Sequence, residues 1–156
     1  NDFPDREKKE FSDEWFYHVY AFGMLKKIED DPPFDEVTKI NFGFLGITGR
    51  TVSLLNGFSV GLEYFYDAGA KEEIERKGIN DDFNKISGLI GHHLLFGKFD
   101  FSQYWGTYIY APYKPATFYQ RYSLSYRIFP WAIAGVTLKA HGDVADSFQV
   151  ILGLAI

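Results

Sequence analysis

From Asp13 to Ile156, polar and apolar residues alternate with a period of two, and this pattern constrains the fold more than any other feature. A period of two is that of a β-strand, whose successive side chains point to opposite faces. Several alternating segments extend over about 12 residues, which is long for a soluble sheet and suits a tilted strand that crosses a membrane. The pattern predicts an all-β protein.

Eight strands are expected, over residues 13–26, 38–50, 57–68, 85–97, 98–111, 118–129, 132–141 and 145–156. The connections between them alternate between long and short, and the charged stretches 26–36 and 71–82 fall in long ones. Outer-membrane barrels alternate long external loops with short periplasmic turns. We therefore expect an eight-stranded antiparallel up-and-down transmembrane β-barrel over residues 13–156, in a bacterial outer membrane, after a charged tail over residues 1–12.

The alternation alone does not say which face lies inside the barrel. The polar face is rich in Gly and Ser and carries single charges, namely Glu63, Arg121, Arg127 and Lys139. A face in water would carry more Lys and Glu, whereas a narrow lumen needs small residues and a few charges that pair with one another. We therefore expect the apolar face toward lipid, with a soluble lipocalin-like barrel, apolar inside, as the alternative.

The aromatic content, 19% of the residues, fits two girdles at the membrane surfaces. The expected outer girdle contains Tyr66, Tyr110, Tyr113 and Tyr119, and the expected inner one contains Trp15 and Trp131. A net charge of −5 argues against a nucleic-acid partner, and the absence of cysteine excludes Cys-ligated zinc or iron–sulfur sites.

Four histidines are candidates for chemistry. His92 and His93 are adjacent within one strand, so their rings point to opposite faces and suit a shared metal poorly. These two and His18 are interpreted as polar filler or interfacial residues. No metal and no cofactor is expected.

His141 is different, because it ends the seventh strand at the outer rim. Taking the polar residues of the last two strands as one face sets His141 opposite Ser147. The same register sets Lys139 opposite Gln149.

Two carboxylates, Asp143 and Asp146, follow His141 in the connecting turn. An imidazole, a hydroxyl and a carboxylate are the groups that nucleophilic acyl transfer uses. A polar hairpin tip is the other interpretation, and the residues alone favour it, because Gly, Asp and Ser are also turn residues.

Three segments are distinctive: GLEYFYD over residues 61–67, YQRYSLSYR over 119–127, and GVTLKAHG over 135–142 followed by Ala145-Asp146. With them, the stretch from residue 57 to 156 resembles the outer-membrane lipid A 3-O-deacylase (PagL-like) family, especially its Bacteroidetes relatives named acyloxyacyl hydrolase. The resemblance implies an eight-stranded outer-membrane barrel that hydrolyses the acyl ester at the 3-position of lipid A without a cofactor. Its partner would be the lipid A or lipopolysaccharide of the outer leaflet.

The same resemblance implies site residues. In the family a His is the base, a Ser two residues later is the nucleophile, and a Glu on the last strand orients the His. His141 matches the base, whereas Asp143 stands at the Ser position and Gln149 at the Glu position. An attacking carboxylate would form a high-energy anhydride, and Gln149 cannot stabilise an imidazolium as a carboxylate does.

The functional hypotheses follow from these departures. In the first, the chain is a hydrolase with His141 as base, Ser147 as nucleophile and Asp143 or Asp146 as orienting group. In the second, it is a degenerate member that serves as a structural or accessory subunit of an outer-membrane protein complex. A small adhesin-like or lipopolysaccharide-binding barrel is a third. The alternation also sends His141 to the polar face, whereas a lipid A enzyme presents its base toward the membrane; a bulge near Gly142 would reconcile the two.

Overall fold

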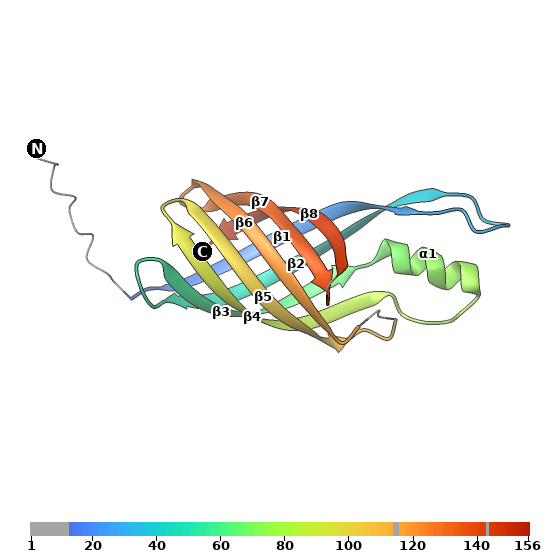
Figure 1. Cartoon of the computed structure of the whole chain (residues 1–156), viewed down its shortest axis with the longest axis horizontal. Helices are drawn as coiled ribbons and strands as arrows, with labels where there is room; N and C mark the ends of the chain where they lie inside the picture. Colours follow the sequence, from blue (N-terminus) through green and yellow to red (C-terminus); the bar gives the residue numbers. More distant parts are fainter. Residues whose placement is uncertain (1–12, 114–115, 143) are drawn as a thin grey trace, which may run out of the picture.

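The computed structural model describes residues 13–113, 116–142 and 144–156, except for the side chains of residues 144–146. Within these residues, eight antiparallel strands follow one another round a closed barrel (Figure 1). They are β1 (Trp15–Ile28), β2 (Val37–Thr51), β3 (Asn56–Tyr66), β4 (Asn84–Phe96), β5 (Phe99–Tyr110), β6 (Phe118–Phe129), β7 (Ala132–His141) and β8 (Val144–Ala155). One helix, α1 (Ala68–Lys77), joins β3 to β4. The expected up-and-down barrel is confirmed, whereas the tail over residues 1–12 lies outside the described residues.

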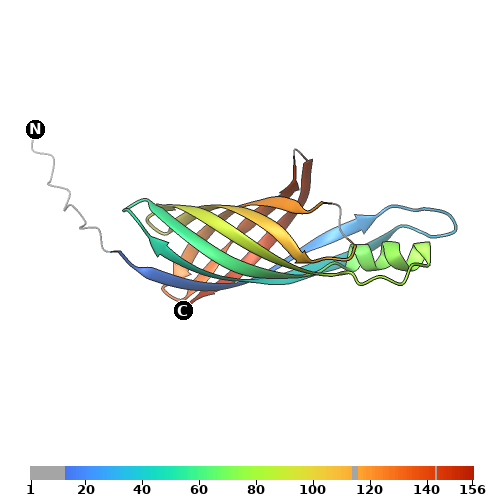
Figure 2. The same cartoon turned by 90° about the horizontal axis from the view of Figure 1, so that it is seen from below.

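The two ends of the barrel differ. The end that carries α1 and the connections β1–β2, β3–β4, β5–β6 and β7–β8 is called the loop end below. The opposite end, called the turn end, carries the short β2–β3, β4–β5 and β6–β7 turns and the C-terminus (Figure 2). At the loop end, β1 and β2 extend past the barrel as a two-stranded arm that runs beside α1.

Helix α1 stands where the sequence predicted only a charged loop. Its N-cap is Asp67, whose carboxylate accepts a hydrogen bond from the Ala70 backbone N–H, and it ends at Gly78 in the left-handed conformation (φ 65°). The second oxygen of Asp67 is paired with Lys85 at 2.7 Å. Because Asp67 caps the helix, β3 ends at Tyr66 and not at residue 68 as expected.

The docking of α1 is predicted to depend on pH through Asp67. Burial raises the pKa of this carboxyl. The Lys85 ammonium and the cap hydrogen bond lower the pKa by more than burial raises it, so the pKa lies below its ordinary value. Such a group stabilises fully above its unfolded pKa of about 3.9, and the contribution is lost as the pH falls through the lowered value. Limited proteolysis between residues 68 and 83 should therefore accelerate below about pH 4. Asp67→Ala should be cleaved rapidly at every pH, whereas Asp81→Ala, at an exposed position, should behave as wild type.

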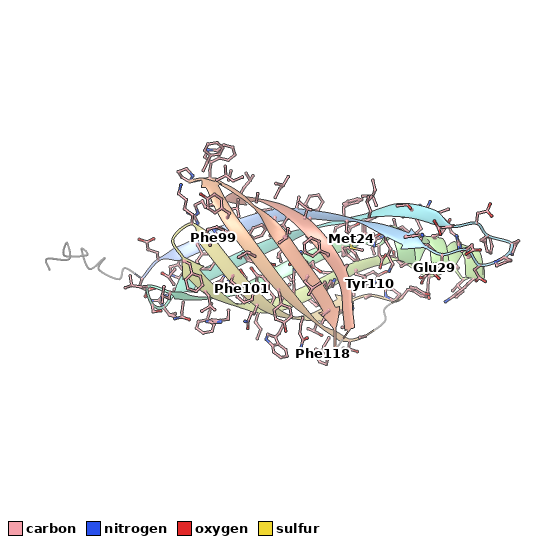
Figure 3. The ribbon with its side chains drawn as sticks, turned by 45° about the horizontal axis from the view of Figure 1, so that its top comes forward. Met24, Glu29, Phe99, Phe101, Tyr110 and Phe118 are labelled. Atoms are coloured by element: carbon pink, nitrogen blue, oxygen red, sulfur yellow. The ribbon has the colours of Figure 1, made fainter. Side chains whose placement is uncertain are left out.

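The outer wall of the barrel is apolar. Leu62, Trp105 and Leu152 are each 62% exposed, and every strand carries exposed apolar residues on its outward face. Figure 3 shows side chains standing out round the wall, with Phe99 toward the turn end and Phe118 toward the loop end. An apolar outer wall is the surface of a membrane-embedded barrel, so the lipocalin-like alternative is wrong. Among the described residues, no helix is long and apolar enough to span a bilayer.

The lumen is filled with side chains. Its apolar part consists of Tyr20, Phe22, Leu45, Ile47, Phe65, Leu89, Tyr104, Tyr108, Tyr119, Ile133 and Ile151. Tyr119 was expected in the outer girdle, and that expectation is wrong: the residue is 2% exposed. It shares the inward face of β6 with Arg121, two residues away, so strand periodicity points it into the lumen.

A charged group occupies the middle of the lumen. Glu63 forms ion pairs with Arg121 and with Lys139, the latter at 3.0 Å, and accepts a hydrogen bond from the Tyr119 hydroxyl at 3.2 Å. All three charged residues are 1% exposed. The expected pairing is thus confirmed for them, but not for Arg127, which is exposed near the turn end of β6.

Removing Glu63 should destabilise the barrel strongly, because Arg121 and Lys139 would stay buried without a counter-charge. Breaking a buried ion pair from one side costs about 3–5 kcal/mol. Glu63→Ala should therefore lower the urea concentration at which half of the protein is unfolded, as measured by the change in gel mobility between the folded and the unfolded barrel. Glu75→Ala, at an exposed position on α1, should leave this concentration unchanged. An unchanged midpoint for Glu63→Ala would show that the lumenal charges do not depend on one another.

Candidate functional site

His141 ends β7 at the loop end and points into the lumen. Its Nε2 is hydrogen-bonded to the Tyr108 hydroxyl at 2.9 Å, and the two rings stack with their centroids 6.0 Å apart. Tyr119 packs on the other side, with a centroid distance of 6.1 Å. The imidazole is half-buried. These contacts hold its ring in one orientation at the upper limit of the packed lumen.

The lumenal charges lie next to this histidine, on its side toward the turn end. Lys139 precedes His141 by two residues on the same face of β7, and its ammonium lies 4.2 Å from the Tyr119 ring centroid and 5.3 Å from that of Tyr108. With Glu63, Arg121 and Lys139, the group carries a formal charge of +1. A base at this position therefore faces a net positive lumen, where a developing oxyanion would be stabilised.

The expected register of the last hairpin is wrong. Ser147 lies opposite Lys139, not His141, and Gln149 lies opposite Thr137. The reason is a tight turn: Gly142 adopts a positive φ of 63°, and the hairpin closes at once with His141 opposite Val144.

A β-bulge accompanies this turn. Ala140 pairs with Ala145 and Lys139 with Ser147, so Asp146 is the extra residue on β8. The sequence suggested a bulge near Gly142 that would turn the base toward lipid. The bulge instead lies in β8, and His141 remains inward against Tyr108.

Ser147 and Gln149 lie side by side on the inner wall of β8. Gln149 donates from Nε2 to the Ser147 hydroxyl at 3.2 Å, and its Oε1 is buried without a hydrogen-bond partner among the described residues. Gln149 thus contacts the candidate nucleophile, whereas the resemblance implies a Glu at this position that orients the base. Asp143 lies outside the described residues, and only the backbone of Asp146 is described.

A second polar cluster lies at the turn end and was not predicted from the sequence. The Ser59 hydroxyl lies 2.7 Å from His93 Nε2, and Asp100 Oδ2 lies 2.8 Å from His93 Nδ1. These distances match a nucleophile, a base and an orienting acid. However, His93 is 0% exposed, lies between the rings of Phe16 and Tyr104, and stands where β4 is paired with both neighbouring strands, so the barrel wall offers a substrate no way to it. His93 fills the lumen, as its interpretation as polar filler predicted.

A cavity of about 730 Å³ also opens at the turn end. Asp100, His18 and Arg127 are among its lining residues, but neither His93 nor Ser59 is. His141 lies at the opposite end of the barrel. In the described part of the chain, no cluster of His, Asp and Glu could hold a metal ion.

The comparison with protein families decides what kind of barrel this is. Residues 15–156 match the family model described as "Acyloxyacyl hydrolase, C-terminal domain" (PagL_C). The chain belongs to this family. No curated protein and no solved structure matches it. The match spans all eight strands of the barrel and includes the positions of His141, Ser147 and Gln149.

The two adjacent histidines of β4 should respond differently to substitution. His93 bonds Ser59, Asp100 and Ser102 in the lumen, whereas His92 points outward, half-buried against Phe58. Leaving a buried polar group unsatisfied costs about 1–3 kcal/mol, and the cavity left by the ring adds to this. His93→Ala should therefore lower the urea midpoint of the purified barrel clearly more than His92→Ala. Equal midpoints would contradict the assignment of His93 to lumen packing.

Proposed function

We propose that this acyloxyacyl hydrolase family member resides in the bacterial outer membrane and hydrolyses an ester-linked acyl chain of lipid A, the 3-O-linked chain of the family. The observation that carries the proposal is the position of His141. It is the histidine that the resemblance assigns as base, it is held by Tyr108 at the loop end of a lipid-facing barrel, and it lies next to the positively charged part of the lumen.

The topology of the barrel indicates in which leaflet of the membrane this base would act. In outer-membrane barrels the longer connections face outward and the short turns face the periplasm. The loop end, which carries α1 and the β1–β2 arm, then faces outward, and the turn end with the C-terminus faces the periplasm. Lipid A occupies the outer leaflet of that membrane. His141 would therefore lie in the same leaflet as the substrate.

In the proposed reaction the Ser147 hydroxyl attacks the acyl carbonyl, and His141 takes its proton. Because Ser147 lies opposite Lys139, we propose that the proton passes through one bridging water, a route open to general bases. The sugar oxygen leaves with the proton from His141, and the acyl chain remains on Ser147. A water molecule, deprotonated by His141, then releases a 3-hydroxy fatty acid and regenerates both side chains.

Three further residues have roles in this proposal. Gln149 positions the nucleophile through its hydrogen bond to the Ser147 hydroxyl. Lys139, directly across the hairpin from Ser147, faces the charge that develops on the carbonyl oxygen. Asp143 or Asp146 would orient His141, as a carboxylate orients the base of a triad.

The second candidate is the degenerate accessory subunit of an outer-membrane complex. The specific observation in its favour is the register of the last hairpin. The hydroxyl of Ser147 lies opposite Lys139 and not opposite His141, and the neighbouring amide of Gln149 cannot act as a carboxylate. The two candidates differ in one measurable property, which is the release of fatty acid.

The hydrolase proposal predicts that purified protein releases 3-hydroxy fatty acid from lipid A of the native host, as detected by mass spectrometry. Loss of a general base costs about 10²–10⁴-fold in rate, and loss of a nucleophile more. His141→Ala and Ser147→Ala should therefore be nearly inert while keeping their heat-modifiable gel mobility, and His92→Ala should retain full activity. If wild type and His141→Ala release equally little, the accessory role replaces the hydrolase.

A further inference from the structure

The barrel is closed unevenly, and its weakest seam lies between the first and last strands. β1 and β8 pair over six residue pairs, from His18–Ala155 to Gly23–Val150. Every other pair of neighbouring strands shares nine to fourteen residue pairs. Beyond Gly23, β1 continues with β2 into the arm, and β8 turns away together with β7 (Figures 1 and 2).

The seam would close if the existing register simply continued. After Gly23 and Val150, the next pairs would be Met24 with Gln149 and Leu25 with Phe148. The structure contains neither pair. The link at this level is a loose contact of 3.9 Å between the Gln149 amide nitrogen and the Met24 sulfur. A flexible thioether therefore lies between the two strands at the level where their pairing has ended.

One polar atom inside the seam lacks a hydrogen-bond partner among the described residues. Gln149 is 0% exposed, yet its Oε1 accepts no hydrogen bond from the described residues. Buried polar atoms are almost always bonded, so an unbonded one calls for a donor that is supplied from elsewhere. The hydroxyl and amide groups around the ester of an acylated sugar are such donors.

The backbone places a second constraint on the seam. Strand edges that are not paired cannot face hydrocarbon, because their N–H and C=O groups would be unsatisfied there. The divergent edges of β1 (24–28) and β8 (144–149) therefore belong at the level of the lipid headgroups. The ester linkages of membrane lipids lie at the boundary between headgroups and acyl chains.

The rims of the seam are apolar. Leu25 is 73% exposed on β1, and Phe148 is 63% exposed on β8, both on the outer wall. On the inner side lie Gln149 and Ser147. The arrangement, apolar outside and polar inside, matches an acyl chain whose ester end points inward.

We propose that the β1–β8 seam is the binding site for the acyl ester of a lipid A molecule, which enters the barrel wall sideways from the outer leaflet. The chain lies against Leu25 and Phe148, and the ester passes between the strand edges to Gln149 and Ser147. This inference rests on the proposed hydrolysis of lipid A. It also explains how a base that faces the lumen reaches a substrate that remains in the membrane.

The first test does not depend on activity. Lipid A with a diazirine in its ester-linked acyl chain, close to the carbonyl, is reconstituted with the wild-type protein and photolysed, and labelled peptides are sequenced by mass spectrometry. Label on the inward residues Met24 and Gln149 is expected in addition to label on the outer wall. Label confined to outward residues, such as Phe148 and Val150, overturns the proposal.

The second test closes the seam with a disulfide, which the absence of native cysteine makes simple. Leu25→Cys with Phe148→Cys bridges the two divergent edges when oxidised. Ala21→Cys with Leu152→Cys is the matched control, because these residues already face each other in the closed part of the same seam.

Oxidation of the Leu25/Phe148 pair should remove the label on Met24 and Gln149 and lower fatty-acid release at least tenfold, and dithiothreitol should restore both. The Ala21/Leu152 pair should be insensitive to oxidation. If all variants are inert but the inward label is lost on oxidation, the hydrolase proposal fails and the binding site stands. If the oxidised Leu25/Phe148 protein keeps its inward label and its activity, the seam is not the binding site.

Discussion

In a hydrocarbon environment the backbone of a β-sheet has no water to bond, so every strand needs a neighbour on both sides. This requirement closes the eight strands of this protein into a barrel and sets the outward face to apolar residues such as Leu62 and Trp105. It also gives meaning to the one place where pairing stops early. The pairing of β1 with β8 stops at Gly23 and Val150, toward the loop end, and we place this level at the boundary between acyl chains and headgroups.

The closed wall encloses a narrow lumen. Apart from the cavity at the turn end, the chain fills this lumen with aromatic rings and paired charges. Glu63 neutralises one of the two cations beside it, and the remaining positive charge lies below Tyr108 and His141. The same residues that stabilise the interior thereby shape the electrostatic field at the candidate site. Lys139, which pairs with Glu63 in the lumen, and His141, at the candidate site, lie on the same face of β7.

The chain belongs to the acyloxyacyl hydrolase family, and the bulge in its β7–β8 hairpin determines which residues lie near one another at the candidate site. His141, the proposed base, lies at the end of β7, whereas the register sets Ser147 opposite Lys139 and beside the Gln149 amide. A seam that admits the substrate sideways would place its ester beside Ser147 and Gln149, below the histidine.

The sequence by itself determined the barrel, its strand number, its apolar outer face and the pairing of Glu63 with Arg121 and Lys139, because each of these follows from a period of two and from the need to pair buried charges. It did not determine helix α1, which depends on the Asp67 cap and on contacts with Lys85 and the arm. It also misplaced Ser147, since one positive φ at Gly142 and one extra residue at Asp146 shift a register that periodicity alone leaves free. The His93 cluster and the β1–β8 seam join residues from strands far apart in the chain, and such contacts exist only once the sheet has closed.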